Sequence, residues 1–275
     1  MPGRRRSLLV RRPGAPGGWQ RALVTGASSG IGRAFVVALA SSGTDVVVVA
    51  RRRERLEGLA AELRAAHGTD AEVLVADVAD EEQLRAVERC LADQARPVDV
   101  LVNCAGFGTH GRFAELPADR EEQQIKVNVL APVRLTHAAL PGMLERGRGG
   151  IVNVSSIAAI QPLPQWATYG ATKAYLTSFS QAVHEEVRHR GVTVLALMPG
   201  FTRSEFQAES GSGTERLPGF VWMSPDSVAC SALDALARGR ATFVPGLGYR
   251  AFAAVSRVAP WGLARRIVHR AGSRL

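Results

Sequence analysis

Short, continuous apolar segments alternate along the chain with longer stretches in which apolar residues recur every three or four positions. The short segments are rich in Val, Leu and Ile, which is typical of strands buried on both faces. They cover residues 21–25, 45–50, 72–75, 98–103, 151–154, 192–198 and 241–244. The longer stretches predict helices over residues 31–42, 53–66, 81–94, 120–144 and 166–190, and a further helix that begins with Ser224 as N-cap and Pro225 in its first turn.

This alternation predicts an α/β fold in which a parallel sheet is covered by helices on both faces. The body contains no internal repeat and no linker, so we expect one domain over residues 19–245. Residues 1–18, rich in Arg, Gly and Pro, are expected to form a disordered basic arm, and residues 246–275 a basic amphipathic C-terminal extension. Ligands of such sheets bind outside the carboxyl ends of the strands, which is where candidate chemistry is expected.

The composition is that of a globular protein. Of 275 residues, 46% are hydrophobic and 21% are charged, which excludes disordered and collagen-like chains. No apolar run reaches the roughly 18–20 residues of a transmembrane helix. Cys90, Cys104 and Cys230 form no CxxC pair, so we expect neither a disulfide framework nor a metal site. The first residues lack the apolar core of a signal peptide, and with the unpaired cysteines this predicts a cytoplasmic protein.

The net charge of +9 comes from the two ends of the chain. Residues 1–20 contribute +5 and residues 235–275 contribute +8, which leaves the body between them at −4. In the C-terminal extension, arginines alternate with apolar residues in a pattern suited to an anionic membrane surface. A tail packed on the body or on another subunit is the alternative, and it is favoured over the membrane surface. We expect no nucleic acid partner, because no aromatic interleaving and no recognised binding module accompany the charge.

A glycine-rich loop joins the first strand to the first helix, where residues 25–32 read TGASSGIG. Glycine permits a tight turn there and lets the backbone approach a pyrophosphate at the helix N-terminus. Such spacing also occurs in ordinary turns, but its place between a buried strand and a helix favours a dinucleotide site. The spacing differs from that of a P-loop, which disfavours a Walker-type site. The predicted cofactor contacts in this loop are Gly26, Ser28, Ser29, Gly30, Ile31 and Gly32.

The end of the second strand indicates which dinucleotide is bound. An acid there would bind the adenosine ribose of NAD, but Arg51, Arg52 and Arg53 follow the strand, and no acid occurs before Glu54. A guanidinium matches a phosphate in geometry and charge, whereas three cations at a helix N-terminus otherwise oppose the helix dipole. Arg51 and Arg52 therefore predict NADP(H) in preference to NAD(H).

Two turns after later strands fit other parts of such a cofactor. Asp77, after the third strand, could accept a hydrogen bond from an adenine amino group. The sequence NCAG at 103–106 follows the fourth strand, and its small residues would let a ribose approach. Each of these features alone would equally suit an ordinary turn.

Tyr169 and Lys173 stand four residues apart in a predicted helix and therefore share one of its faces. A cation beside a phenol favours the phenolate and lowers the phenol pKa from about 10 towards neutral pH. Such a phenol donates a proton to a carbonyl oxygen as hydride arrives, or accepts one in the reverse direction. Ser156 follows the fifth strand, where its hydroxyl can bind the same oxygen. Taken alone, a Tyr–Lys pair at this spacing favours an ordinary exposed helix face over a catalytic pair.

Taken together, these motifs resemble those of the short-chain dehydrogenase/reductase family in its compact, single-domain form. The matching elements, in the family's order, are TGASSGIG at 25–32, Asp77-Val78, NCAG at 103–106, Asn128, Ser156, the Tyr169–Lys173 pair and Pro199-Gly200. The resemblance implies a three-layer, Rossmann-type, doubly wound parallel sheet of about seven strands. It also implies a small-molecule substrate and a homo-oligomer, either a dimer or a tetramer.

The resemblance gives each site residue a role. Tyr169 is implied as general acid/base, Lys173 as the residue that tunes it and binds the nicotinamide ribose, Ser156 as the group that orients the carbonyl, and Asn128 as the holder of a water in the proton relay. The implied cofactor contacts outside the glycine-rich loop are Arg51, Arg52, Asp77, Val78, Asn103, Ala105, Gly106, Tyr169, Lys173, Pro199, Gly200 and Thr202. Two positions depart from the family pattern, Cys104 within the NAG element and Ser204 in place of a Thr.

The segment 201–223 mixes four aromatic residues with Ser-Gly-Ser-Gly at 210–213. It predicts either a lid whose apolar inner face covers a hydrophobic ketone or alcohol, or a loose surface connection. The function expected from the sequence is NADP(H)-dependent interconversion of a carbonyl and an alcohol. The alternative is a membrane-surface or scaffold protein that retains a dinucleotide-binding fold.

Overall fold

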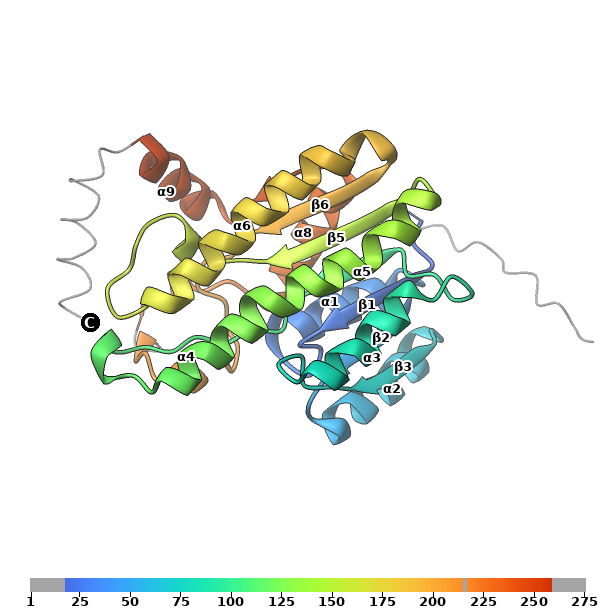
Figure 1. Ribbon diagram of the computed structural model, residues 1–275, viewed down its shortest axis with the longest axis horizontal. Helices are drawn as coiled ribbons and strands as arrows, with labels where there is room; N and C mark the ends of the chain where they lie inside the picture. The colour runs from blue at the N-terminus through green and yellow to red at the C-terminus, as the bar shows by residue number, and fades with distance from the viewer. Residues whose placement is uncertain (1–17, 215–216, 259–275) are drawn as a thin grey trace, which may run out of the picture.

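A computed structural model describes residues 18–214 and 217–258. One parallel sheet of seven strands runs through it in the order β3-β2-β1-β4-β5-β6-β7 (Figure 1). The strands are β1 (Arg21–Thr25), β2 (Asp45–Ala50), β3 (Ala71–Val75), β4 (Val100–Asn103), β5 (Gly149–Val154), β6 (Val192–Leu197) and β7 (Thr242–Phe243). The order reverses between β1 and β4, and a doubly wound sheet binds its ligand at this reversal.

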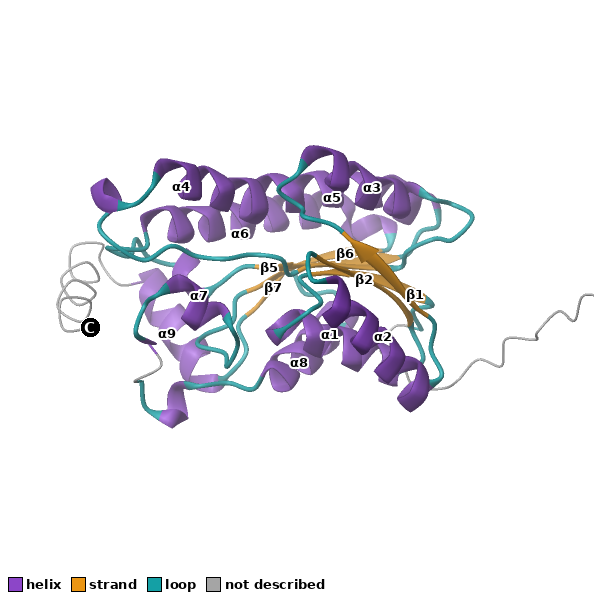
Figure 2. Cartoon of the chain, turned by 90° about the horizontal axis from the view of Figure 1, so that it is seen from below, coloured by secondary structure: helices purple, strands orange, loops and turns teal. Residues whose placement is uncertain are grey.

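Helices cover both faces of the sheet, which gives the three layers seen edge-on in Figure 2. One layer contains α1 (Gly30–Ser41), α2 (Arg53–His67) and α8 (Pro225–Ala237), and the other contains α3 (Glu81–Ala92), α5 (Ala131–Glu145) and α6 (Ala167–Val187). Each layer packs its own hydrophobic core against the sheet, the first around Phe35 and the second around Met143. The predicted Rossmann-type architecture is therefore confirmed.

The middle of the sheet is largely apolar because neither of its faces meets water there. In β2 the four consecutive valines 46–49 are all at most 1% exposed, and they alternate between the two cores. Residues that could bind a ligand or react are consequently found just after the strands. The site lies at the carboxyl ends of the strands.

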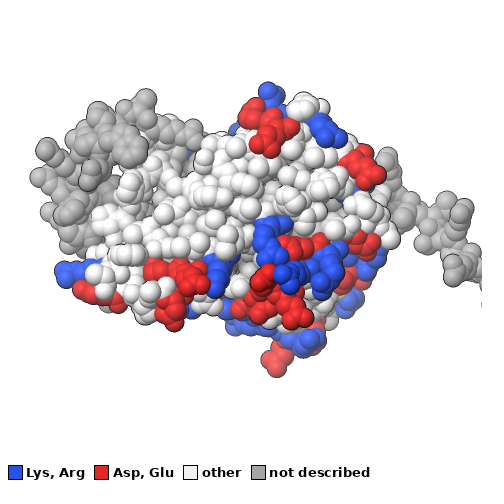
Figure 3. All heavy atoms as spheres, in the orientation of Figure 1, with Lys and Arg blue, Asp and Glu red and all other residues white. Residues whose placement is uncertain are grey.

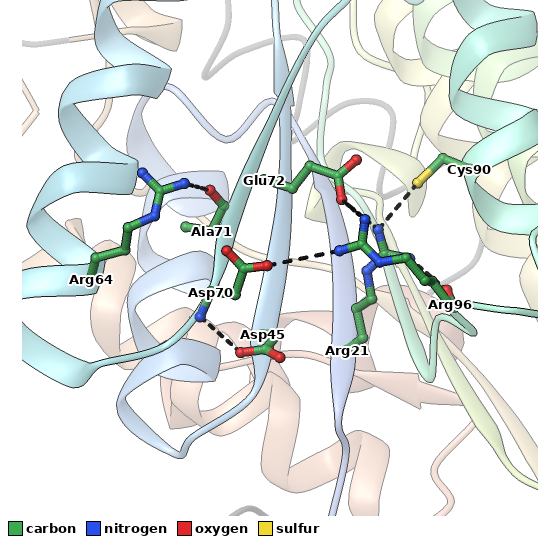
Figure 4. A network of polar contacts seen from close by, with 8 residues as sticks. All are labelled: Arg21, Asp45, Arg64, Asp70, Ala71, Glu72, Cys90 and Arg96. Atoms are coloured by element: carbon green, nitrogen blue, oxygen red, sulfur yellow. Dashed lines mark hydrogen bonds and ion pairs between the residues drawn. The ribbon is translucent and has the colours of Figure 1, made fainter. Parts of the chain in front are cut away.

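The opposite edge is held by a polar network at the start of β1, β2 and β3 (Figure 4). The Arg21 guanidinium donates to the Glu72 carboxylate at 2.7 Å, and Arg96 approaches the same carboxylate at 2.9 Å. The backbone N–H of Asp70 donates to the Asp45 carboxylate at 2.8 Å. The Arg21 side chain is only 11% exposed, and its ion pair links the starts of β1 and β3.

The observed boundaries differ from the predicted ones by a few residues. The helix expected at 120–144 is a continuous run of α4 (Ala118–Ile125), a π-helical turn (Lys126–Leu130) and α5. The helix expected at 166–190 ends at Val187 and continues as a 3-10 turn over Arg188–Arg190. The Ser224 cap of α8 is confirmed, because its side chain accepts a hydrogen bond from the N–H of Ser227.

Both predicted basic ends fall largely outside the described residues. Of the expected arm only residue 18 is described, and of the C-terminal extension only residues up to 258, which include α9 (Leu247–Val258). The segment 201–223 contains a short helix α7 (Phe206–Ser210) and a 3-10 turn (Gly219–Val221). Within the described part of the chain, no helix has the length and apolar content needed to span a membrane.

Candidate active site

The glycine-rich loop, which joins β1 to α1, is a tight turn packed against the residues that follow β4. Gly26 has a φ of +69°, and a Cβ there would lie 2.8 Å from the backbone nitrogen of Ala105. A Cβ on Gly32 would lie 2.2 Å from the carbonyl oxygen of Gly26, so Gly32 lets α1 pack directly on the loop. Ser29 is the N-cap residue of α1 but makes no capping hydrogen bond. The helix N-terminus is thus left able to bind an anion.

Of the predicted phosphate ligands, Arg52 lies closest to this loop. Its guanidinium donates to the Ser28 hydroxyl at 2.9 Å and to the Glu205 carboxylate at 2.7 Å. Arg51 instead extends away, with a side chain 66% exposed and 4.0 Å from the Asp77 carboxylate. The structure therefore brings Ser28 and Arg52 together and leaves Arg51 on the rim.

The predicted residues Asp77, Val78 and Asn103, at and after the ends of β3 and β4, range from half-buried to buried. Asp77 accepts a hydrogen bond from the N–H of Ala79 at 2.9 Å, and Val78 is buried. Asn103 is 2% exposed, and its amide donates to Asn153 at 2.8 Å between β4 and β5. The Asn103 side chain therefore belongs to the core.

The turn after β4 is fixed by a residue that the sequence did not single out. The Thr25 hydroxyl, at the end of β1, accepts hydrogen bonds from the N–H groups of Cys104 and Ala105, both at 3.1 Å. Gly106 follows, and a Cβ there would lie 3.0 Å from Asn128 Oδ1 and 3.4 Å from Lys173 Nζ. The expected cofactor turn thus directly adjoins the expected catalytic residues.

Tyr169, Lys173 and Ser156 meet where β5 ends against the first turns of α6. Lys173 Nζ donates to the carbonyl oxygen of Val154 at 2.8 Å and lies 5.8 Å from the centroid of the Tyr169 ring. The side chain of Ser156 hydrogen-bonds the Tyr169 hydroxyl and also accepts from the N–H of Ala158 at 3.1 Å. All three functional groups therefore converge on one place.

The titration behaviour of this group differs from the sequence expectation. Burial raises the pKa of Tyr169 to about 12, against a smaller lowering by the hydrogen bond with Ser156. Burial also lowers the pKa of Lys173 to about 8. The expected lowering of the phenol pKa is therefore wrong in this structure, because burial raises this pKa and Lys173 is not among the groups that lower it. Tyr169 is a neutral proton donor at neutral pH.

Asn128 lies in the π-helical turn and is fully buried. Its Oδ1 accepts from the N–H of Phe107 at 3.2 Å, and its Nδ2 donates to the carbonyl oxygen of Phe107 at 2.9 Å. Nδ2 also lies 3.2 Å from the Thr172 hydroxyl, which itself donates to the carbonyl oxygen of Tyr169. Asn128 thus connects the loop after β4 to the helix that carries the phenol.

The predicted nicotinamide turn lies beside Ser156. The carbonyl oxygen of Pro199 accepts from the N–H of Ile157 at 3.1 Å, and the Thr202 hydroxyl donates to the carbonyl oxygen of Gly200 at 3.0 Å. A Cβ on Gly200 would lie 2.2 Å from the ring of Tyr249, so α9 packs directly on this turn.

An aromatic cluster that the sequence did not predict surrounds the phenol. The Tyr169 ring lies 5.4 Å from Trp166 and 5.3 Å from Phe206, and the latter two rings are 10° from parallel. His110 lies 5.1 Å from Trp166. A Cβ on Gly108 would lie within 2.9–3.0 Å of Trp166, Phe206 and Tyr169. Phe206 belongs to the segment 201–223, so this segment presents an apolar face to the site, as a lid would.

A cavity of about 520 Å³ opens beside the glycine-rich loop, between the start of α1 and the segment that carries Glu205. Its lining includes Arg33, Arg55 and Arg203. Among the residues that the structure describes, no group of three His, Cys, Asp or Glu side chains could hold a metal ion.

Comparison with known proteins gives matches to the family that the sequence motifs resemble. The model of the short chain dehydrogenase family matches residues 20–215. A short chain dehydrogenase of Pseudocercospora fijiensis is 39% identical over 189 residues, 68% of this chain and 61% of its own. The inactive hydroxysteroid dehydrogenase-like protein 1 of Rattus norvegicus is 34% identical over 207 residues, 74% of this chain and 61% of its own. The chain thus spans about three fifths of the length of these curated relatives.

Among solved structures, a short-chain dehydrogenase from Sphingobium yanoikuyae in complex with NADPH superimposes with a TM-score of 0.81. The two chains are 35% identical, and the match covers 90% of this chain and 95% of the other.

Proposed function

The chain belongs to the short chain dehydrogenase family, and from that premise we propose that it interconverts a hydrophobic ketone and the corresponding alcohol with NADP(H). The observation that carries this proposal is the convergence of Tyr169, Ser156 and Lys173 beside the glycine-rich cofactor turn. A neutral phenol held next to a serine hydroxyl is a proton donor aimed at a carbonyl oxygen.

The residues around the loop suit NADP(H). The uncapped N-terminus of α1 would hold the pyrophosphate, and Arg52 with Ser28 would hold the 2′-phosphate of the adenosine ribose. The absence of an acid at the end of β2 supports the phosphate-bearing form. The solved relative bound to NADPH supports a nicotinamide dinucleotide more generally. When bound, this cofactor supplies or accepts the hydride.

Tyr169 moves the proton. In reduction the carbonyl carbon gains the hydride, the π electron pair of the C=O bond becomes an oxygen lone pair, and Tyr169 gives its hydroxyl proton to that oxygen. The hydrogen bond with Ser156 orients the substrate oxygen and the phenol alike. The Lys173 ammonium, 5.8 Å from the ring, stabilises the negative charge left on Tyr169. Asn128 fixes the backbone beneath this group through Phe107 and Thr172.

The surroundings of the phenol indicate the class of substrate. Trp166, Phe206 and the backbone of Gly108 form an apolar wall around Tyr169. Such a wall favours an apolar, bulky carbonyl compound over a phosphorylated or acidic one.

The test is an NADPH-consumption assay with aliphatic, steroid and acyl-thioester carbonyls. Tyr169→Phe removes only the hydroxyl, so we expect kcat to fall by about 10²–10⁴-fold while NADPH affinity stays nearly unchanged. Arg52→Ala should bring the dissociation constants of NADPH and NADH closer together. Retained turnover in Tyr169→Phe would remove Tyr169 as the acid, and equal affinities of the unmodified protein for the two cofactors would overturn the NADP(H) assignment.

A second candidate function is a binding or scaffold role without turnover. It is favoured by the similarity to a relative whose name describes it as inactive. The intact set of Asn128, Ser156, Tyr169 and Lys173 favours the enzyme instead. Cofactor binding without hydride transfer to any carbonyl in the assay would favour the scaffold.

A further inference from the structure

Glu205 makes an unusual link between the two halves of the site. Its carboxylate contacts Arg52 Nη1 at 2.7 Å through one oxygen and Arg55 Nη1 at 2.5 Å through the other. Arg52 at the same time donates to the Ser28 hydroxyl in the glycine-rich loop. We call Glu205 with these two arginines the Glu205 bridge. It joins the segment 201–223 to the place where the proposed function puts the 2′-phosphate.

The backbone around Glu205 is pressed onto the cofactor loop. A Cβ on Gly30 would lie 2.8 Å from the Cβ of Ser204. The next residue after the bridge, Phe206, packs its ring 5.3 Å from that of Tyr169. Two consecutive side chains of one short segment thus contact the phosphate end and the proton donor.

Arg52 and Arg55 form an anion site that the Glu205 carboxylate already occupies. A carboxylate and a phosphate both present oxygens to guanidinium groups, and the phosphate carries more charge. Hydrogen bonds from Arg55 and Arg52 lower the pKa of Glu205, which is therefore ionised at neutral pH. The side chains of Arg52, Arg55 and Glu205 are 38%, 49% and 40% exposed, so water screens the bridge and a stronger anion can replace it.

Two neighbouring arginines are held by other carboxylates, whereas Arg52 and Arg55 are held by Glu205 itself. Arg33 makes a two-oxygen contact with Glu62, and Arg53 pairs with Glu57. The phosphate and Glu205 would therefore compete for the same two cations.

We propose that Glu205 occupies the position of the cofactor's 2′-phosphate in the free protein, and that the phosphate displaces it and so releases the segment that carries Phe206 from the cofactor loop. This inference rests on the proposed NADP(H) site. It makes Glu205 a residue that contributes to the choice between NADP(H) and NAD(H), although it lies in the segment 201–223 that also contacts the proton donor. A cofactor without the 2′-phosphate would leave the bridge and the segment in place.

Binding of two small probes isolates the phosphate contribution. Adenosine 2′,5′-bisphosphate carries the phosphate in question and 5′-AMP does not, and neither contains nicotinamide. Glu205→Gln removes the competing charge, so we expect it to tighten adenosine 2′,5′-bisphosphate about fivefold and to leave 5′-AMP within about twofold. Glu209→Gln is the matched control, because it removes the same charge four residues further along α7, and it should change neither affinity. Calorimetric titration measures all of these constants.

Hydrogen exchange of residues 203–210 tests the release itself. In the unmodified protein, adenosine 2′,5′-bisphosphate should raise the exchange rate of these amides, and 5′-AMP should not. In Glu205→Gln their exchange should already be raised, and the bisphosphate should add nothing further. Unchanged or slower exchange with the bisphosphate, or unchanged or weaker bisphosphate binding in Glu205→Gln, overturns the proposal.

The outcomes separate this inference from the proposed function. If the unmodified protein binds the bisphosphate no more tightly than 5′-AMP, the NADP(H) assignment fails and the inference fails with it. If it prefers the bisphosphate but Glu205→Gln behaves as Glu209→Gln does, only the role of Glu205 is overturned.

Discussion

At the scale of single residues, the ionisation of Lys173 is set closer to neutral pH than that of Tyr169. Burial lowers its pKa to about 8, whereas burial raises the pKa of Tyr169 to about 12. As pH rises, the lysine therefore loses its charge well before the phenol can lose its proton. Tyr169 keeps its proton over the whole pH range of an activity assay. Lys173, whose ammonium stabilises the negative charge left on Tyr169 after proton transfer, does not keep its charge over that range.

We therefore expect carbonyl reduction to weaken above about pH 8, the pKa of Lys173. In the kcat/KM for NADPH, which reports ionisations of the free enzyme, the profile should be flat at lower pH and should fall about tenfold per pH unit above that value. The chain has only two lysines, Lys126 and Lys173, so a labelled-lysine NMR titration gives two signals that Lys126→Met assigns. A Lys173 signal that titrates near the ordinary lysine pKa of about 10.4 would contradict this prediction.

The sequence predicted which residues gather at the site better than it predicted their environment. Tyr169, Lys173 and Ser156 were recognisable because a helical spacing of four and a position after a strand are local signals. The direction in which the Tyr169 pKa shifts could not be recognised from the sequence. It depends on burial under Trp166 and Phe206, which are brought there by tertiary packing. Glu205 had no sequence signal at all, since its partners lie about 150 positions away along the chain.

At the scale of elements, apolar patterning sufficed for the strands but not for local departures from regular helix. The stretch after residue 118 has helical periodicity throughout, and nothing in it indicates that Lys126–Leu130 forms a π-helical turn. That turn carries Asn128 with its amide hydrogen-bonded to the loop after β4. π-Helical turns are frequent at functional sites, where they reposition a side chain at some cost in helix regularity.

The contact between α1 and the glycine-rich loop can be tested by adding one methyl group at a glycine. Gly32→Ala places a Cβ 2.2 Å from the carbonyl oxygen of Gly26, so we expect the free energy of unfolding to fall by about 1–3 kcal/mol. Gly58→Ala makes the same change inside α2, where no atom lies within 4 Å, and there it should raise the free energy by about 0.5–1 kcal/mol. Urea denaturation measures both, and equal effects of the two substitutions would contradict the close contact at Gly32.

At the scale of the whole molecule, charge and apolar surface are separated. Figure 3 shows most of the charged side chains along the lower edge of this face and a smaller group at its upper edge, while the broad middle, over α5 and α6, is largely uncharged. Exposed apolar side chains occur on the continuous helical run that leads into α5 and on α6: Ile125 is 42%, Leu130 is 50% and Tyr175 is 48% exposed. A second group lies on α9, where Leu247 is 81% and Val255 is 65% exposed. Both groups could serve the homo-oligomer expected from the family resemblance.

The face formed by α5 and α6 is the better candidate for contact with a second copy. It is broad, and it contains a rigid aromatic pair, Tyr175 and Phe179, with ring planes 12° apart, whereas α9 is a single helix whose basic continuation also suits an anionic surface. We therefore expect Leu130→Glu to convert the oligomer to monomer, because it would bury an unpaired charge. Leu247→Glu, the same substitution on α9, should leave the mass unchanged. Light scattering after gel filtration measures both, and a monomeric unmodified protein, or dissociation by Leu247→Glu alone, would move the interface away from α5 and α6.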